Sequence, residues 1–451
     1  GRVQGLPGAA STVWWLVGRN SWFQLELFQF ERPIAKLMNP DLRPCDIGYT
    51  RIGIWVDDFD VTINKLAGLG SKPLTPPLGE PGRRRACVRN PDGVYVEIME
   101  DDPLPEFNQR GRLDCPAAIR SVTVSVAQLS DAAAYFGTGI GLKASSVTLH
   151  TPEHEALWGL PGATTESRLF DGGEVLIDVV HYLDPVGRQR ANDYRICDQG
   201  ILNIAFGARR KPDFDAVYRR AEAFGAKPNC KPVHLPGAGV VYVTDKHGFS
   251  VEILSTKPGL ADRLVGFESR PLHKRPDPDT RSIQHRVKIK APPAEVWAAI
   301  TDQDNMAQWI GFNPVTVLRE GWTERHGAGS ERLMQGPPGV GKIVEQVIAT
   351  KAHESLRYRV IKGSPLTSHQ GEITLTQSGE LTELHWCIRF RPKVAGTGAI
   401  LQPLLQRMLT TMMDGHLKPY IETRSASSRG PSNPEKPHPP RRPADVSPPN
   451  H

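Results

Sequence analysis

The chain has 451 residues, of which 39% are hydrophobic and 23% are charged. A single hydrophobic core does not grow this large, so we expect two to four domains, and this composition excludes a wholly disordered chain. The net charge of +6 is modest, so nucleic-acid binding is not indicated.

An internal repeat organises the first 270 residues. The sequence Gly-Leu-Pro-Gly-Ala at 5–9 recurs at 159–163, and the segment 90–98 recurs in pattern at 245–253. In the second pair, a turn containing glycine precedes a strand of alternating polar and apolar residues. Because a repeat of this length marks a structural unit, we predict two similar domains, residues 1–112 and 113–270.

Each predicted domain contains two halves of the order βαβββ. The first domain has an expected strand at 51–56, a helix at 61–69 and a strand at 94–99. The second has strands and helices at 119–126, 129–136, 174–182, 201–206, 213–224 and 249–254. The first copy has only four residues before its Gly-Leu-Pro-Gly, whereas the second has the segment 119–158. We therefore expect the first domain to be truncated, with about 40 residues upstream of Gly1.

The pattern changes at residue 281. Alternating strands are predicted at 282–290, 330–335, 342–350, 356–362, 369–377 and 382–392, a helix with prolines at its start follows residue 290, and an amphipathic helix spans 399–421. An antiparallel sheet around one long helix is the simplest packing for a third domain, residues 281–424. The segment 425–451 is rich in proline and serine and is predicted to be a disordered tail.

The paired βαβββ halves, the turn at Asn90–Gly93 and the glutamate in the last strand resemble the vicinal-oxygen-chelate (VOC) superfamily, which includes glyoxalases and bleomycin-resistance proteins. The resemblance covers residues 1–270 and implies an α+β fold. It also implies a divalent metal held by inward side chains on the first and last strands of each half. Carried onto the first copy, these positions are Glu26, Arg51 and Glu97. Carried onto the second, they are Ser121, Asp178, Asn203 and Glu252.

The first copy departs from the family pattern at Arg51. A guanidinium stays protonated and cannot ligate a cation. We expect Arg51 to lie between Glu26 and Glu97 in place of the metal, and the alternative is a plain buried ion pair.

The second copy offers four oxygen ligands in Asp178, Glu252, Asn203 and Ser121, a set that suits Mg, Mn or Ca. Alternatively, Asp178 and Glu252 face each other as an acid and base pair, or the site is a metal-free cleft. The candidate catalytic residues are Asp178, Glu252, Glu26, Arg51 and Glu97.

Tandem domains of this kind also resemble extradiol dioxygenases, whose iron needs two histidines and a carboxylate. Neither copy places a histidine at those positions, so this activity is disfavoured. His181 lies three residues from Asp178 and so points to the opposite face of its strand. His150, His154, His234 and His247 fall near loops and receive no role.

Residues 281–424 resemble the polyketide cyclase/dehydrase branch of the START-like, helix-grip (SRPBCC) superfamily. The resemblance is carried by Ala291–Trp297 after the first strand, Met306–Trp309, and the closing helix to Ile421. It implies a curved sheet and a long helix that enclose an apolar ligand cavity. The candidate cavity residues are Trp309, Arg332, Tyr358, His369, Trp386 and Arg389.

Together, the resemblances favour an enzyme of the isomerase, lyase, hydratase or cyclase type that acts on an apolar, carbonyl-bearing, cyclic substrate. The alternatives are a metal-free protein that binds or sequesters a small molecule, and a scaffold in which only domain pairing survives. The expected partner is a small hydrophobic or aromatic ligand, with a homodimer allowed. Six cysteines without paired spacing and no long apolar run predict a cytoplasmic protein without a membrane segment.

Overall fold

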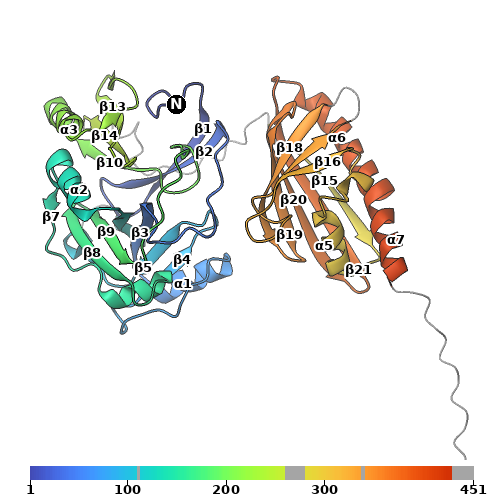
Figure 1. Cartoon of the computed structure of the whole chain (residues 1–451), viewed down its shortest axis with the longest axis horizontal. Coiled ribbons are helices and arrows are strands. Elements are labelled where there is room, and N and C mark those ends of the chain that lie inside the picture. Colours follow the sequence, from blue (N-terminus) through green and yellow to red (C-terminus); the bar gives the residue numbers. More distant parts are fainter. Residues whose placement is uncertain (109–111, 258, 260–279, 337–340, 429–451) are drawn as a thin grey trace, which may run out of the picture. The chain divides into compact units, whose positions relative to one another are not determined.

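The computed structural model describes residues 1–108, 112–257, 259, 280–336 and 341–428. The chain divides into two compact units, Gly1–Lys274 and Arg275–His451 (Figure 1). Both mix helices with sheets, which confirms the α+β class. None of the helices in these residues combines the length and the apolar content that crossing a membrane requires. All six cysteines are free thiols, as their spacing predicts.

A seven-stranded sheet forms the centre of the N-terminal unit, with the strand order β4-β5-β3-β6-β9-β8-β7. Its strands are β3 (Gly48–Val56), β4 (Arg85–Arg89), β5 (Tyr95–Met99), β6 (Ala117–Ser125), β7 (Lys143–Ala144), β8 (Thr164–Asp171) and β9 (Leu176–Asp184). The helices α1 (Phe59–Gly68) and α2 (Leu129–Ala134) connect them. The sheet is continuous across residue 112, because β3 pairs antiparallel with β6. The expected division of the unit at residue 112 stays a prediction.

Two smaller sheets complete the unit. A hairpin is formed by β1 (Ala10–Val17) and β2 (Gln24–Arg32). A five-stranded sheet contains β10 (Asn203–Ala208), β11 (Lys227–Pro228), β12 (Val233–Leu235), β13 (Ala238–Thr244) and β14 (Ser250–Thr256), with the helix α3 (Lys211–Ala223). The predicted elements of the second copy thus all form within a few residues of their expected bounds.

The same pairing recurs three times in this unit. A first strand is followed by a helix and pairs parallel with the last strand of its segment: β3 with β5, β6 with β9, and β10 with β14. In each segment the alternate apolar residues of the last strand pack toward the helix. Val96 and Ile98 of β5, for example, lie in the cluster that contains residues of α1. The residues between them, such as Glu97, therefore face away from the helices.

The C-terminal unit is one antiparallel sheet with a long closing helix, which are the elements expected of a helix-grip domain. Its strand order is β15-β21-β20-β19-β18-β17-β16. The strands are β15 (Arg281–Ile289), β16 (Val315–Arg319), β17 (Glu331–Gln335), β18 (Lys342–Lys351), β19 (Ser355–Lys362), β20 (Leu366–Ser378) and β21 (Leu381–Pro392). The short helix α5 (Pro293–Thr301) begins with prolines, as expected.

The closing helix consists of α6 (Gly398–Met412), one π-helical turn and α7 (Lys418–Ser428). Leu409, Met413, Leu417 and Ile421 recur every four residues and lie in the core of the unit, which explains the amphipathic pattern of the sequence. The helix includes residues 425–428, so the predicted disordered tail begins too early there. The rest of that tail lies outside the described residues.

Candidate functional site

Four ionisable side chains meet on the face of the seven-stranded sheet opposite α1 and α2, and we name them the charged cluster: Arg51, Glu97, His150 and Asp178. Nε of Arg51 lies 3.8 Å from Glu97 and Nη2 lies 3.7 Å from Asp178. The imidazole of His150 joins the two carboxylates, with Nε2 2.9 Å from Glu97 and Nδ1 3.2 Å from Asp178. Strand alternation on β3, β5 and β9 turns three of these side chains to the same face, strand pairing brings them together, and His150 comes from the segment between β7 and β8.

The charged cluster is enclosed and electrically compensated. Arg51 is 1% exposed and Glu97 is fully buried. Burial alone would raise the pKa of Glu97, but His150, Arg85 and Arg51 outweigh it and hold the pKa well below its ordinary range. Burial likewise disfavours a charged His150, yet Glu97 and Asp178 outweigh it and raise the pKa of the imidazole. The cluster therefore stabilises a cation at His150.

Aromatic and polar neighbours hold Arg51 in place. Its guanidinium carbon lies 3.6 Å from the centre of the Trp158 ring, a cation–π distance. Trp158 Nε1 and Tyr182 Oη donate to the same oxygen of Glu155, at 2.7 and 3.0 Å. Nε and Nη1 of Arg51 have no hydrogen-bond partner among the described residues. Arg51 is thus held by charge and stacking rather than by bidentate hydrogen bonds.

The expected pairing of Arg51 is half correct. Glu97 is a partner, but the second carboxylate is Asp178 and not Glu26. The reason is strand pairing: β3 joins β6, which pairs parallel with β9, so the second half of the first copy shares its sheet with the first half of the second. His150 was missed because it enters from a loop, where no periodicity marks a side chain as inward.

Glu26 and Glu252 form a second group, the carboxyl pair. Glu26 accepts from Trp15 Nε1 at 2.6 Å and from Gln24 Nε2 at 3.2 Å. Burial raises the pKa of Glu26. Burial, together with the negative charge of Glu26, raises the pKa of Glu252 to about 7, although hydrogen bonds from Tyr242 and Asn203 oppose the shift. One proton is therefore readily held here at neutral pH.

The predicted contact between Asp178 and Glu252 is wrong, because Asp178 pairs with Arg51 and His150 whereas Glu252 bonds to Tyr242 and Asn203. The two carboxyls lie on β9 and β14, which belong to different sheets.

This separation bears on the expected metal ligands. Ser121 and Asp178 belong to the seven-stranded sheet, whereas Asn203 and Glu252 belong to the five-stranded one. Asp178 already has a guanidinium 3.7 Å away, which repels a cation. The four residues therefore do not fit a single divalent ion.

The interior of the C-terminal unit holds a third group, which we name the interior polar set: Trp309, Arg332, Glu345, Tyr358, His369 and Trp386. Arg332 donates through Nε and Nη2 to one oxygen of Glu345, at 3.0 and 2.6 Å. Its guanidinium carbon lies 5.8 Å from the centre of the Tyr358 ring. Trp386 Nε1 donates to Tyr358 Oη at 3.1 Å. The ring of Trp309 packs against that of Trp386, and the ring of His369 packs against that of Tyr358, with a centroid distance of 6.3 Å in each pair.

Local backbone irregularities position this set. The register of β20 against β21 shifts between Thr367 and Gln370, and Ser368 has a φ of 51°. Such a bulge re-aims the next side chain, here His369, toward Tyr358. A Cβ at position 371 would lie 2.1 Å from the ring of Tyr358, so only a glycine at this position leaves room for that ring.

Five of the six predicted cavity residues belong to the interior polar set. Arg389 does not, because it is exposed. It lies three residues from the buried Trp386 on the same strand, and strand alternation places the two on opposite faces.

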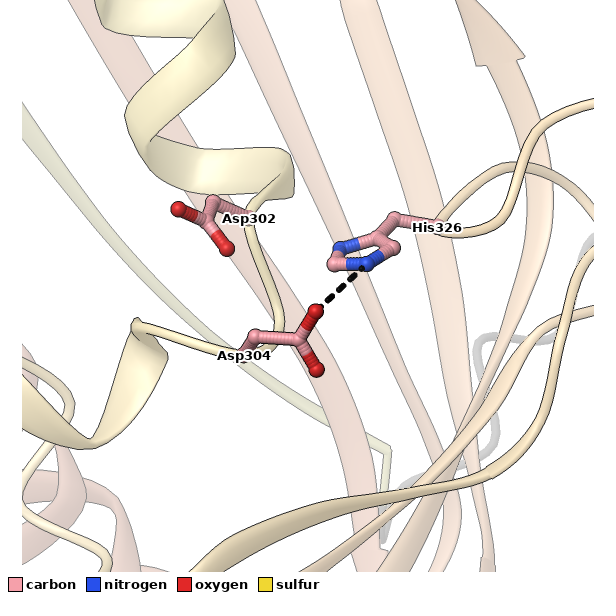
Figure 2. A group of neighbouring side chains, drawn as sticks. All are labelled: Asp302, Asp304 and His326. Atoms are coloured by element: carbon pink, nitrogen blue, oxygen red, sulfur yellow. Dashed lines mark ion pairs between the residues drawn. The ribbon is translucent and has the colours of Figure 1, made fainter.

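One further group of carboxylate and imidazole ligand atoms lies close enough for a metal among the described residues: Asp302, Asp304 and His326 (Figure 2). Its atoms already have partners. Nδ1 of His326 accepts from the backbone N–H of Gln303 at 2.7 Å. Nη2 of Arg325 lies 3.2 Å from Asp304, and Nε2 of His326 lies 3.3 Å from Asp304 and 3.1 Å from Nε of Arg325. A guanidinium in contact with the ligand atoms disfavours a cation, so we interpret the group as an internally bonded loop.

Comparison with known proteins identifies a family match within the C-terminal unit. Residues 280–422 match the family described as polyketide cyclase / dehydrase and lipid transport, so the chain carries a domain of this family there. Similar solved structures include a norcoclaurine synthase point mutant from Thalictrum flavum, 13% identical, which covers 32% of this chain and 96% of that chain with a TM-score of 0.28. A protein from Thermus thermophilus is 16% identical, and the match covers 33% of this chain and 99% of the Thermus protein, with a TM-score of 0.28. No curated protein matches the chain.

Proposed function

We propose that the C-terminal unit, with its polyketide cyclase and lipid transport domain, binds a small and largely apolar molecule at the interior polar set. One observation carries this proposal. Trp309 Nε1, Arg332 Nη1 and both ring nitrogens of His369 are buried without a hydrogen-bond partner among the described residues. A buried donor without a hydrogen-bond partner costs about 1 to 3 kcal/mol. Several such atoms in one interior therefore support a site at which a ligand supplies the missing partners.

The surroundings favour an apolar body for that ligand. Trp309, Tyr358 and Trp386 are each at most 3% exposed and lie in the same core cluster as Met334, Val347 and Ile373. Aromatic and aliphatic walls with a few convergent polar atoms are the usual composition of small-molecule sites.

We expect the neutral fluorescent probe N-phenylnaphthylamine to bind the full chain saturably at one site. Met334→Trp should weaken this binding at least about tenfold, because Met334 is buried two residues from Arg332 on β17, on the same face of the strand, and the larger ring would occupy the interior volume proposed for the probe. Fluorescence titration measures both. The matched control is Leu318→Trp, which adds the same ring at an exposed position of β16. Equal binding by the two variants, or none by the wild type, would count against the proposal.

A second candidate function concerns the N-terminal unit. We propose that it is a VOC-type enzymatic domain that acts on a small carbonyl-bearing molecule. The recurring parallel pairing of first and last strands supports it. So does the charged cluster, whose Arg51, Glu97 and Asp178 occupy strand positions that hold metal ligands in that superfamily. Here Arg51 and His150 supply positive charge where a metal would, and the pKa of His150 is raised by the two carboxylates, which makes it the group best placed to move a proton.

Arg51→His tests this relationship. The change removes the permanent cation and adds an imidazole beside Glu97, Asp178 and His150, a set of ligands that suits Zn, Ni or Mn. We expect calorimetric titration to detect a binding site for one of these ions that the wild type lacks. Arg168→His, at an exposed position of β8, is the control and should bind as the wild type does. Indistinguishable titrations for all three proteins would contradict the proposed relationship.

A further inference from the structure

We infer that the polar group recognised in the C-terminal unit is a neutral carbonyl oxygen, which accepts hydrogen bonds from Arg332 and Trp309, and not a carboxylate. This inference rests on the proposed ligand-binding function and names the chemistry of its ligand. Nη1 of Arg332 and Nε1 of Trp309 are both donors, and neither nitrogen can accept. An oxygen acceptor is therefore the complement that each of these two donors requires.

The charge balance of the interior argues against an anion. The guanidinium of Arg332 is already neutralised by Glu345, which accepts two of its hydrogen bonds, and the two side chains are only 3% and 7% exposed. His369 adds no compensating charge, because burial lowers the pKa of its imidazole. A carboxylate would bring an uncompensated negative charge into this apolar interior, at a large desolvation cost. A ketone or ester carbonyl accepts the same hydrogen bonds without that cost.

His369 extends the recognition to a neighbouring group of the ligand. A neutral imidazole has one N–H donor and one acceptor nitrogen, and both are without partners among the described residues. The bulge before His369 aims the ring at Tyr358, around which Arg332 and Trp386 also pack. A hydroxyl near the carbonyl would therefore find a partner in His369.

The experiment uses the full chain and three competitors of one ring size: the ketone acetonaphthone, the hydrocarbon ethylnaphthalene and the anion naphthoate, each substituted at the same carbon. Each is titrated against bound N-phenylnaphthylamine. We expect the ketone to displace the probe about tenfold more effectively than the hydrocarbon, although the hydrocarbon is the more hydrophobic compound. We expect naphthoate to be at least about tenfold weaker than the ketone.

Two variants assign the effect to the named donors. Trp309→Phe removes one N–H and keeps an aromatic ring, so it should reduce the preference for the ketone over the hydrocarbon severalfold, with each competitor measured against that variant's own affinity for the probe. Arg332→Met combined with Glu345→Leu removes both charges together, which avoids a buried unpaired charge, and should reduce the preference further. Trp322→Phe, in a loop of the same unit outside the interior polar set, is the matched control and should keep it.

The outcomes separate this inference from the proposed function. Probe binding with equal displacement by ketone and hydrocarbon would overturn the inference and leave ligand binding standing. Tightest binding by naphthoate would overturn it in the same way and show an anion site. Absence of probe binding by a folded chain would overturn both. A preference for the ketone that Trp322→Phe keeps and Trp309→Phe loses would establish it.

Discussion

Replacing Arg51 by methionine should lower the free energy of unfolding of the N-terminal unit by about 3 to 5 kcal/mol, the usual cost of removing one partner from a buried ion pair. Methionine retains most of the apolar volume, so the loss reports charge rather than a cavity. Glu97 and Asp178 would keep only His150 and Arg85 as compensation in a site that excludes water. Urea denaturation followed by circular dichroism measures the change.

The control for this prediction is Arg168→Met on β8. Arg168 is exposed, and surface substitutions of this kind usually change stability by less than about 0.5 kcal/mol. If Arg51→Met unfolds at the same urea concentration as this control, the charged cluster does not stabilise the fold and the cation at Arg51 is dispensable.

Glu252→Gln should raise the free energy of unfolding, and the size of this increase should depend on pH. The pKa of Glu252 is raised from 4.5 to about 7 by burial and by Glu26. The folded protein thus holds this proton more tightly than the unfolded chain, so wild-type stability falls as the pH rises from about 4.5 through about 7. Glutamine is never charged and can still bond to Tyr242 and Asn203. We expect the variant to be more stable than the wild type by up to about 3 kcal/mol near pH 8, and little changed near pH 4.

Unfolding curves across this pH range measure the difference. Glu80→Gln is the matched control, because Glu80 is exposed and its replacement should give a difference that does not vary with pH. A Glu252→Gln variant that is equally stable or less stable near pH 8 would show that the carboxyl pair is hydrated or compensated and that Glu252 holds no extra proton.

The sequence was sufficient for the local elements. Alternation predicted strands such as β5 and β21, and the amphipathic pattern of residues 399–421 predicted the closing helix. These patterns report which face of one element is buried, and that information is local. The exposure of Arg389 follows from the same alternation, since a separation of three residues along β21 places Arg389 and the buried Trp386 on opposite faces.

The sequence by itself determined the α+β class, the repeated segments, the helix-grip elements and the inward positions of Arg51, Glu97 and Tyr358. Only the tertiary structure decided which inward residues meet. Asp178, and not the expected Glu26, lies beside Arg51 because β3 pairs with β6. His150 contacts both carboxylates from a loop. The physical reason is that periodicity specifies the face of a strand but not its neighbour. Pairing between distant strands depends on how whole segments bury their surfaces against each other.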